Sequence, residues 1–372
     1  MLEPGPAPIL VAAGGTGGHL FPAEALAAAL RQRGIATHLA TDRRAARFGA
    51  GFADDSIHLV ASATIRARNP VALTRTVGLL SLGVVQAWTL IGRLKPAAVI
   101  GFGGYPTIPP VLAAAWRGVP SLIHDANAVI GRANRLLAPR VTAVATTFPD
   151  VFAAEPDLAA KATLTGNPVR AAVVAAAAVP YAKPAAGDRL RILVFGGSQG
   201  ARVMGEIVPA AIRRIDAALR GRLAVVQQAR EEDVSRVREA YAKLGVAADV
   251  APFFADLPAR MADSHLVISR SGASTVAELS AIGRPSILVP LPHAIDQDQF
   301  ANAGMLERAG GARRLTQDAF TPQRLASEIA ALAAAPQQLA AMAAAARSLG
   351  RLDAADRLAD LVLRVAAERT NK

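Results

Sequence analysis

The 372-residue chain is 52% hydrophobic, which predicts two domains with full cores, and its lack of cysteine excludes disulfides and thiolate metal sites. Its 41 basic and 29 acidic residues give a net charge of +12, which favours a polyanionic partner such as an anionic lipid or a phosphorylated substrate. Aromatic residues make up only 4% of the chain and no nucleic-acid motif occurs, so we expect no nucleic-acid partner. The first eight residues include an acid and three prolines, so we expect no signal peptide.

The first half of the chain alternates short apolar runs with helical stretches. Continuous apolar strands separated by helices predict an α/β fold with a parallel sheet. The predicted strands are residues 9–13, 37–40, 97–101 and 121–124, and the predicted helices are residues 22–33 and 109–117.

Residues 76–92 form a strongly apolar segment without any charge. Seventeen residues of helix reach only ~25 Å, short of the ~30 Å hydrocarbon core of a bilayer. The segment is therefore either a buried helix with solvated arginines at its ends or an interfacial patch with arginines on lipid phosphates. The residues that would form such a patch are Leu79, Leu82 and Trp88, with Arg75 and Arg93 among the flanking basic residues.

The second half repeats the α/β pattern after a stretch at residues 181–189 that is typical of a linker. The alanine-rich residues 336–369 should be helical, with a break at Gly350. The predicted strands are residues 191–195, 224–228, 266–269 and 286–290.

Each half begins with an apolar strand, a glycine turn and a helix. The turns are GGTGGH at residues 14–19 and GGSQGA at residues 196–201. Such a turn presents a helix N-terminus to an anion, so two of them predict two similar lobes around a cleft for a nucleotide diphosphate. His19 at the first helix start is either a cap or a general base, since imidazole titrates near neutrality.

Other polar groups follow predicted strands, where open α/β sheets bind ligands. They occur in GFGGYP at residues 101–106, in IHDANA at residues 123–128 and in SRSGASTVAE at residues 269–278. The first turn does not fit G-x-G-x-x-G, and Asp42 is the nearest candidate for the acid of a dinucleotide site. Asp296 and Asp298 form an acid-x-acid pair, but we expect no obligatory metal.

Seven motifs in order make the chain resemble the MurG family of bacterial N-acetylglucosaminyltransferases along essentially its whole length. The motifs are GGTGGH from Gly14, GFGGYP from Gly101, HDANAVIGRAN from His124, TGNPVR from Thr165, GGSQGA from Gly196, SRSGASTVAE from Ser269 and DQDQFANA from Asp296.

The resemblance implies an inverting GT-B glycosyltransferase with two Rossmann-like lobes of parallel sheet and an interlobe cleft. It implies transfer of N-acetylglucosamine from UDP-N-acetylglucosamine to the 4-hydroxyl of the muramyl-pentapeptide of undecaprenyl-linked lipid I, giving lipid II, with no cofactor. The implied acceptor and membrane lobe is residues 1–168, the donor lobe is residues 169–349, and the tail at about 350–372 packs back on the first lobe. The implied location is peripheral, on the cytoplasmic face of the bacterial inner membrane, where other cell-wall synthesis proteins are possible partners.

The resemblance also assigns roles to individual residues. His19 is the favoured base, with Asn127 and Asp125 beside the reacting centre, and Glu278 takes the ribose hydroxyls. The other implied substrate contacts are Thr16, Gly17, Gly18, Tyr105, Arg170, Ser198, Phe254, Ala273, Ser274, Thr275 and Gln299.

Three positions depart from the family pattern. Asp125-Ala126 stands where Glu-Gln is usual, Asp298 replaces a common amide, and residues 227–230 replace a histidine-containing turn. The alternatives are another GT-B transferase of UDP-sugars, a UDP-sugar epimerase, a dinucleotide-dependent oxidoreductase or a non-catalytic UDP-sugar sensor.

Overall fold

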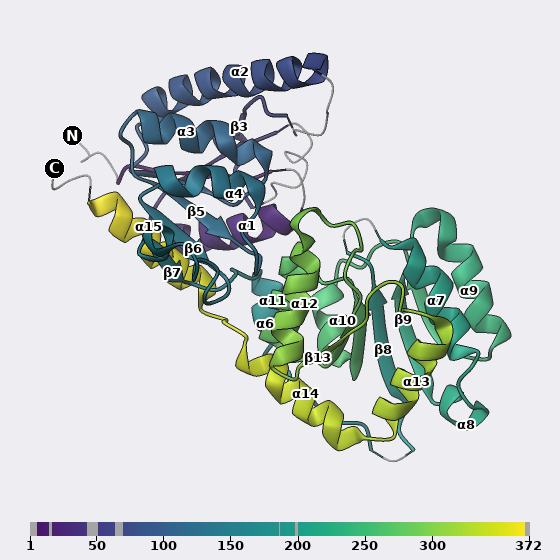
Figure 1. Ribbon diagram of the computed structural model, residues 1–372. Coiled ribbons are helices and arrows are strands. Elements are labelled where there is room, and N and C mark those ends of the chain that lie inside the picture. The colour runs from purple at the N-terminus through teal and green to yellow at the C-terminus, as the bar shows by residue number, and fades with distance from the viewer. Residues whose placement is uncertain are drawn as a thin grey trace. The chain divides into compact units, whose positions relative to one another are not determined.

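The computed structural model describes residues 6–14, 17–42, 51–63, 70–185, 187–197 and 200–368 (Figure 1). The chain divides into two compact units. Unit 1 consists of Met1–Arg170 and Leu352–Lys372, and unit 2 consists of Ala171–Arg351.

Unit 1 is built on a seven-stranded parallel sheet with the order β3-β2-β1-β4-β5-β6-β7. Side chains that alternate along β1 enter different cores, because successive residues of a strand point to opposite faces. Ile9 and Val11 join the core under α1 and α15, whereas Leu10 and Ala12 join the core under α2, α3 and α4. The strands are β1 (Ile9–Ala12), β2 (Thr37–Thr41), β3 (Ile57–Leu59), β4 (Ala98–Gly101), β5 (Ser121–Asp125), β6 (Ala143–Thr146) and β7 (Ala162–Leu164).

The helices of unit 1 cover both faces of this sheet. The C-terminal helix, yellow in Figure 1, packs against the first helix of the chain although more than 300 residues separate them. The helices are α1 (Gly17–Gln32), α2 (Pro70–Leu94), α3 (Ile108–Trp116), α4 (Arg132–Leu137), α5 (Pro156–Ala159) and α15 (Ala354–Ala367), with 3-10 turns η2 (Asp54–Ser56), η3 (Tyr105–Thr107) and η4 (Ala138–Arg140).

Unit 2 repeats the design with a six-stranded parallel sheet of the order β10-β9-β8-β11-β12-β13. Its main core lies between the sheet and α7, α9 and α13. The strands are β8 (Leu190–Phe195), β9 (Leu223–Gln228), β10 (Ala247–Ala251), β11 (Leu266–Ser269), β12 (Ser286–Leu288) and β13 (Ala312–Arg314). The helices are α6 (Ala171–Ala176), α7 (Arg202–Ile212), α8 (Ala217–Arg220), α9 (Val234–Lys243), α10 (Leu257–Asp263), α11 (Ala273–Ile282), α12 (Asp298–Arg308), α13 (Pro322–Ala333) and α14 (Pro336–Ser348), with 3-10 turns η5 (Glu231–Asp233) and η6 (Ile295–Gln297).

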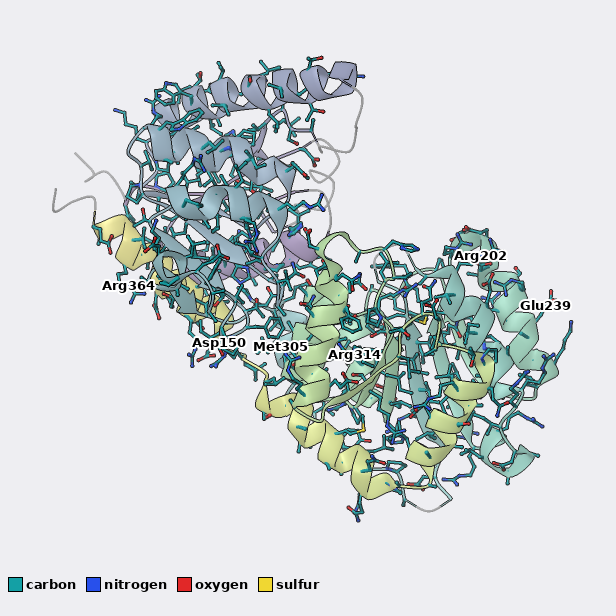
Figure 2. All side chains as sticks on the ribbon, in the orientation of Figure 1. Asp150, Arg202, Glu239, Met305, Arg314 and Arg364 are labelled. Atoms are coloured by element: carbon teal, nitrogen blue, oxygen red, sulfur yellow. The ribbon has the colours of Figure 1, made fainter. Side chains whose placement is uncertain are left out.

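The edge strand β13 is attached to α12 by one arginine. Arg314, labelled in Figure 2, lies 3.9 Å from the centre of the Phe300 ring and pairs with Glu307 at 2.8 Å. A cation above an aromatic face and a charged hydrogen bond both stabilise the contact.

The structure adds five strands that the sequence pattern did not predict: β3, β6, β7, β10 and β13. Several of these are short and lack a continuous apolar run, as in ATL of β7 and ARR of β13. The first helix also begins at Gly17, five residues before the predicted start at Pro22, which lies inside it.

The apolar segment belongs to a longer helix than we predicted. α2 has 25 residues, and its part from Thr74 to Leu94 is long and apolar enough to cross a membrane by length and composition. The interpretation as a buried helix with solvated arginines at its ends is wrong, because only one side of α2 is covered. Ala87, Leu90 and Ile91 enter the core of unit 1, while most of the helix surface is exposed.

Arg284 links three helix ends inside unit 2. It is only 1% exposed, and its guanidinium donates to the backbone carbonyl oxygens of Val179, Ala262, Ile282 and Gly283. These carbonyls follow α6, belong to the last turns of α10 and α11, or directly follow α11. Burial lowers the pKa of Arg284 to about 10, so the side chain stays charged at neutral pH. A cation at helix C-termini is stabilised by the helix dipoles and by carbonyls that otherwise lack a donor.

We expect Arg284→Met to destabilise the protein by about 3 kcal/mol or more, because it leaves buried carbonyl oxygens without a donor. Urea denaturation followed by circular dichroism measures the loss. Arg357→Met is the matched control, since it removes the exposed ion pair with Asp353 and should change stability by about 0.5 kcal/mol or less. Equal effects of the two substitutions would contradict this role of Arg284.

Candidate functional site

His19 lies in the first turn of α1, and its ring packs against the loop that follows β4. A Cβ atom on Gly103 or Gly104 would lie 3.3 or 3.4 Å from the imidazole. Both glycines have positive φ angles, 89° and 74°. The loop therefore needs glycine at both positions, for its conformation and for its close approach to the histidine.

The environment of His19 favours the neutral imidazole. Burial lowers its pKa from 6.5, and a hydrogen bond with the backbone of Phe102 opposes part of the shift. The N-terminal end of the α1 dipole acts in the same direction as burial. Within the described parts of the chain, Nδ1 of His19 has no hydrogen-bond partner. A neutral imidazole is the protonation state that a general base requires.

His124 and Asp125 end the neighbouring strand β5, and both are buried. Nε2 of His124 lies 3.0 Å from the carbonyl oxygen of Gly166, and its ring centre lies 5.4 Å from that of Phe102. Burial lowers the pKa of His124 to about 4, and His19 adds to the shift. His124 is therefore a buried, neutral side chain close to His19.

Asp125 is a loop anchor in this structure. Its carboxylate accepts hydrogen bonds from the backbone N–H groups of Asn127 and Gly131 and from Nδ2 of Asn134, each at 3.0 Å. It is 1% exposed, and burial raises its pKa. These contacts shape the loop that carries Asn127, and the placement of Asp125 beside the reacting centre stays a prediction.

The remaining predicted residues of unit 1 lie on the same elements or close to them. Gly17 and Gly18 are the first residues of α1, and Tyr105 opens η3 after the glycine loop. Arg170 stacks on the Phe21 ring at 4.2 Å, so the last residue of unit 1 contacts α1. Thr16 and Ser198, both predicted substrate contacts, lie outside the described residues.

In unit 2 the predicted phosphate contacts form the start of α11. Ala273, Ser274 and Thr275 are its first three residues, and Gly272 precedes them without any side-chain cap. The first N–H groups of a helix have no partner within the helix, so this start is suited to an anion. Glu278 lies further along α11 and is 7% exposed.

Gln299 lies at the start of α12 and is tied to the turn before α11. Its Oε1 accepts from Leu291 N at 3.1 Å, and its carbonyl oxygen accepts from Ser271 Oγ at 2.8 Å. Asn302 Nδ2 donates to the carbonyl oxygen of Ser271 at 3.3 Å. The structure therefore brings the motifs at residues 269–278 and 296–303 together within unit 2.

The turns after β8 and β10 also end at this edge of the sheet. The glycine loop follows β8, and Pro252, Phe253 and Phe254 follow β10. The Phe254 ring is buried under the Arg260 guanidinium at 4.3 Å, whereas Phe253 is 69% exposed. This stretch thus carries one buried, fixed aromatic side chain beside one exposed aromatic side chain.

Within the described parts of the chain, the two acids near Gln299 form no metal centre with other side chains. Burial raises the pKa of Asp298, and its Oδ1 accepts from Gln299 N at 2.7 Å. Among the residues that the structure describes, no three or more His, Asp and Glu side chains gather as a metal site would require.

Three buried polar residues of the site had no predicted role: Asn134, Arg270 and Gln228. Asn134 bonds Asp125, as described, and the carbonyl of His124 at 3.0 Å. Arg270 donates to the carbonyls of Val289 and Pro290 at 3.1 and 2.9 Å. In the sequence, each of these residues is visible only as a polar residue inside or directly after an apolar strand, or inside a motif. Their hydrogen-bond partners lie elsewhere in the chain, so the sequence alone could not identify them.

The exposed side of α2 carries an apolar stripe. Four of its side chains are large, hydrophobic and well exposed: Val77 (54%), Leu82 (50%), Val85 (63%) and Trp88 (41%). Leu79 is half-buried, and Arg75 and Arg93 are exposed near the two ends. The neighbouring helix α3 adds Trp116, which is 61% exposed, and Arg117, whose guanidinium lies 4.5 Å from the Trp88 ring centre. A stripe of this kind rimmed by arginines is typical of an interfacial surface.

Comparison with known proteins gives two domain families. The glycosyltransferase family 28 N-terminal domain matches residues 9–146, and the glycosyltransferase family 28 C-terminal domain matches residues 191–358. A protein of Rhodopseudomonas palustris is 63% identical over 96% of both chains, and one of Nitrobacter winogradskyi is 62% identical over 96% of this chain and 97% of its own. Both are named UDP-N-acetylglucosamine--N-acetylmuramyl-(pentapeptide) pyrophosphoryl-undecaprenol N-acetylglucosamine transferase.

Solved structures share the fold. The crystal structure of Acinetobacter baumannii MurG superposes with a TM-score of 0.78 at 30% identity, over 96% of this chain and all of that one. The UDP-GlcNAc 2-epimerase of Neisseria meningitidis superposes with a TM-score of 0.68 at 13% identity, over 96% of this chain and all of its own, which shows a common fold only. The GT-B fold with two parallel-sheet lobes is thereby confirmed.

The pH dependence of stability tests the burial of His124. Because its pKa is about 4 in the folded protein and about 6.5 when unfolded, the unfolded chain gains a proton as the pH falls through this range, and stability falls with it. Between pH 7 and pH 5, protonation of His124 in the unfolded chain lowers the free energy of unfolding by about 2 kcal/mol. His124→Gln should abolish this contribution. Urea denaturation at both pH values measures the difference, with His293→Gln at an exposed site as control. An unchanged pH dependence in His124→Gln would refute the assignment.

Proposed function

Because the chain belongs to the family of UDP-N-acetylglucosamine--N-acetylmuramyl-(pentapeptide) pyrophosphoryl-undecaprenol N-acetylglucosamine transferases, we propose that its two units divide one reaction between acceptor and donor. The enzyme transfers N-acetylglucosamine from UDP-N-acetylglucosamine to lipid I and forms lipid II for peptidoglycan synthesis. It needs no cofactor. Unit 1 takes the lipid-linked acceptor, and unit 2 takes the donor.

The donor site is assigned to the carboxyl edge of the unit 2 sheet. The start of α11 and the glycine loop after β8 offer backbone N–H groups to the diphosphate. Glu278 accepts from the ribose hydroxyls, Gln299 contacts the sugar, and the stretch at Phe254 takes the uracil. These roles need no metal, because N–H groups and a helix dipole stabilise the charge that develops on the leaving UDP.

The chemical step is a direct displacement with His19 as the base. The 4-hydroxyl of the acceptor sugar attacks the anomeric carbon, its proton passes to His19, and the bond from the anomeric carbon to UDP breaks. The observation that carries this role is the neutral, partly enclosed imidazole against the Gly103-Gly104 backbone. Asn127, on the loop that the Asp125 carboxylate holds, is assigned to the reacting centre, and Arg170 and Tyr105 are assigned to its polar surroundings.

The membrane surface is assigned to the apolar stripe of α2. Lipid I remains in the bilayer, so the enzyme must reach it from the membrane face. Val77, Leu82, Val85 and Trp88 can enter the acyl boundary while Arg75 and Arg93 meet anionic headgroups. The enzyme is then a peripheral protein of the cytoplasmic face, in reach of other proteins of cell-wall synthesis.

We expect His19→Ala to reduce transfer of labelled N-acetylglucosamine to a short-chain lipid I analogue by about a hundredfold or more, because a positioned base contributes about 10² to 10⁴ to the rate. In the wild type, the acidic limb of kcat/KM against pH should lie below pH 6.5, since the folded pKa of His19 is lowered.

The control is UDP binding, which His19→Ala should leave within about twofold if the residue acts in chemistry. Transfer by a folded His19→Ala protein at the wild-type rate would reduce His19 to a helix cap. An acidic limb above pH 6.5 would also contradict its role as the base.

We expect the double substitution Leu82→Ser and Val85→Ser to weaken binding to phosphatidylglycerol vesicles by about tenfold, because it removes two exposed apolar side chains from the contact. Cosedimentation measures this binding, and isothermal titration with UDP should show no change. Val174→Ser with Val179→Ser removes two other exposed valines, in unit 2, and should leave vesicle binding unchanged. Equal loss of UDP and vesicle binding would mean that the α2 variant has unfolded.

A further inference from the structure

The turn after β9 contacts two loops of the proposed donor site. Gln228, the last residue of β9, is 7% exposed. Its Oε1 accepts from Gly196 N at 3.2 Å, and its Nε2 donates to the carbonyl oxygen of Pro252 at 3.2 Å. Because β9 lies between β8 and β10, one amide sets the spacing between the glycine loop and the stretch at Phe254.

The described ends of the glycine loop, Gly196 and Gly200-Ala201, pack closely against their neighbours. A Cβ atom on Gly196 would lie 2.2 Å from Ala201 N, and Gly200 has a φ of +68°. A Cβ on Gly200 would lie 3.0 Å from Cγ of Arg230. The turn after β9 thus touches both ends of the loop, Gly196 through Gln228 and Gly200 through the stem of Arg230.

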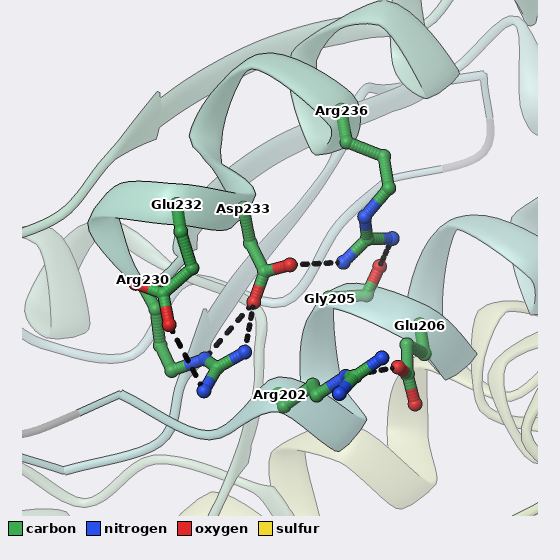
Figure 3. Close-up of polar contacts among 7 residues, drawn as sticks. All are labelled: Arg202, Gly205, Glu206, Arg230, Glu232, Asp233 and Arg236. Atoms are coloured by element: carbon green, nitrogen blue, oxygen red, sulfur yellow. Dashed lines mark hydrogen bonds and ion pairs between the residues drawn. The ribbon is translucent and has the colours of Figure 1, made fainter.

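The guanidinium of Arg230 is itself held in place (Figure 3). It donates to Oδ2 of Asp233 at 3.0 and 2.9 Å and pairs with Glu232 at 3.0 Å. The other oxygen of Asp233 accepts from Arg236 at 2.6 Å, and Arg236 donates to the carbonyl oxygen of Gly205 at 3.1 Å. Since Gly205 lies in α7, which follows the loop, the network joins the turn after β9 to both sides of the glycine loop.

We propose that Gln228 and Arg230 are positioning residues for the donor nucleotide. Gln228 fixes the distance between the loop for the diphosphate and the stretch for the uracil, and Arg230 fixes the glycine loop against α7. Neither needs to touch the ligand, because a site whose N–H groups are already aimed loses less freedom on binding. The inference rests on the proposed donor site in unit 2.

The neighbouring Gln227 offers a matched control. Adjacent residues of a strand point to opposite faces. Gln227 accordingly accepts from the hydroxyl of Tyr241 on α9 and is fully buried on the other side of the sheet from the loop contacts. Its substitution by methionine removes a buried hydrogen bond one residue away without touching either donor loop.

The experiment measures dissociation constants of UDP and uridine by isothermal titration, and kcat and KM for UDP-N-acetylglucosamine. Gln228→Met should weaken both UDP and uridine by about tenfold, since both loops lose their connection. Arg230→Met should weaken UDP by a similar factor but leave uridine within about twofold, because only the diphosphate side is loosened. In both variants KM should rise while kcat stays within about threefold.

Gln228→Glu is a milder second variant. It keeps an acceptor for Gly196 N and removes the donor to Pro252, so it should weaken uridine even if Gln228→Met folds poorly. Gln227→Met should lower the melting temperature and leave both dissociation constants within about twofold.

Two results would overturn the inference. The first is wild-type binding of UDP by Gln228→Met, Gln228→Glu and Arg230→Met, and the second is equal loss in Gln227→Met, which would mean a purely structural effect. The variant Glu278→Gln distinguishes a failure of this inference from a failure of the proposed donor site. If Glu278→Gln loses UDP binding and the turn variants do not, only this inference fails; if Glu278→Gln binds UDP normally, the proposed donor site fails.

Discussion

The parallel arrangement of both sheets is the constraint on which the rest of the molecule depends. Strands that run in one direction end at one edge, so every turn that follows a strand gathers there. In unit 1 this edge holds the His19 turn, the Gly103-Gly104 loop and the loop of Asn127. In unit 2 it holds the glycine loop, the start of α11 and the start of α12. Helices that begin at this edge also direct their N–H groups to it, which suits an anionic substrate.

Loops at a sheet edge need support from buried polar side chains, and this chain supplies such support in both units. Asp125 uses its carboxylate to hold the loop that carries Asn127, and Gln228 uses its amide to join the turns after β8 and β10. The Asp125 carboxylate and the Gln228 amide are both nearly fully buried. The hydrogen bonds that they make replace those that water would otherwise make to the loops. A buried polar group with its partners in place is stable, and the loss of one partner is costly, which makes these residues rigid parts of the site.

The C-terminal ends of the helices are also held by polar side chains, but these side chains are positively charged. Helices that start at the ligand edge end on the other side of their unit, where carbonyl groups lack donors. Arg284 meets the carbonyls after α6 and at the ends of α10 and α11, and Arg347 donates to those of Ala177 and Ala281. Part of the excess of basic residues in this chain thus has an internal role, while the arginines beside α2 face solvent and fit an anionic surface.

The sequence alone determined the fold class, the repeated strand-turn-helix design and the family, because these depend on local patterns. Apolar runs identify strands, glycine turns identify helix starts at anion sites, and seven motifs in order identify the reaction. The positions of His19 and of the α11 start could also be predicted, since each lies within a few residues of a recognisable strand.

Tertiary structure alone decided the contacts between segments that are distant in the chain. The five additional strands include short ones whose pairing, not their composition, makes them strands. Even the nearby donors to Asp125, up to nine residues further along the chain, meet its carboxylate only through the fold of the Asn127 loop. The role of Gln228 depends on Gly196 and Pro252, and the exposed side of α2 depends on which of its residues the core of unit 1 covers. Such pairings arise from how the strands and helices pack, which no local pattern encodes.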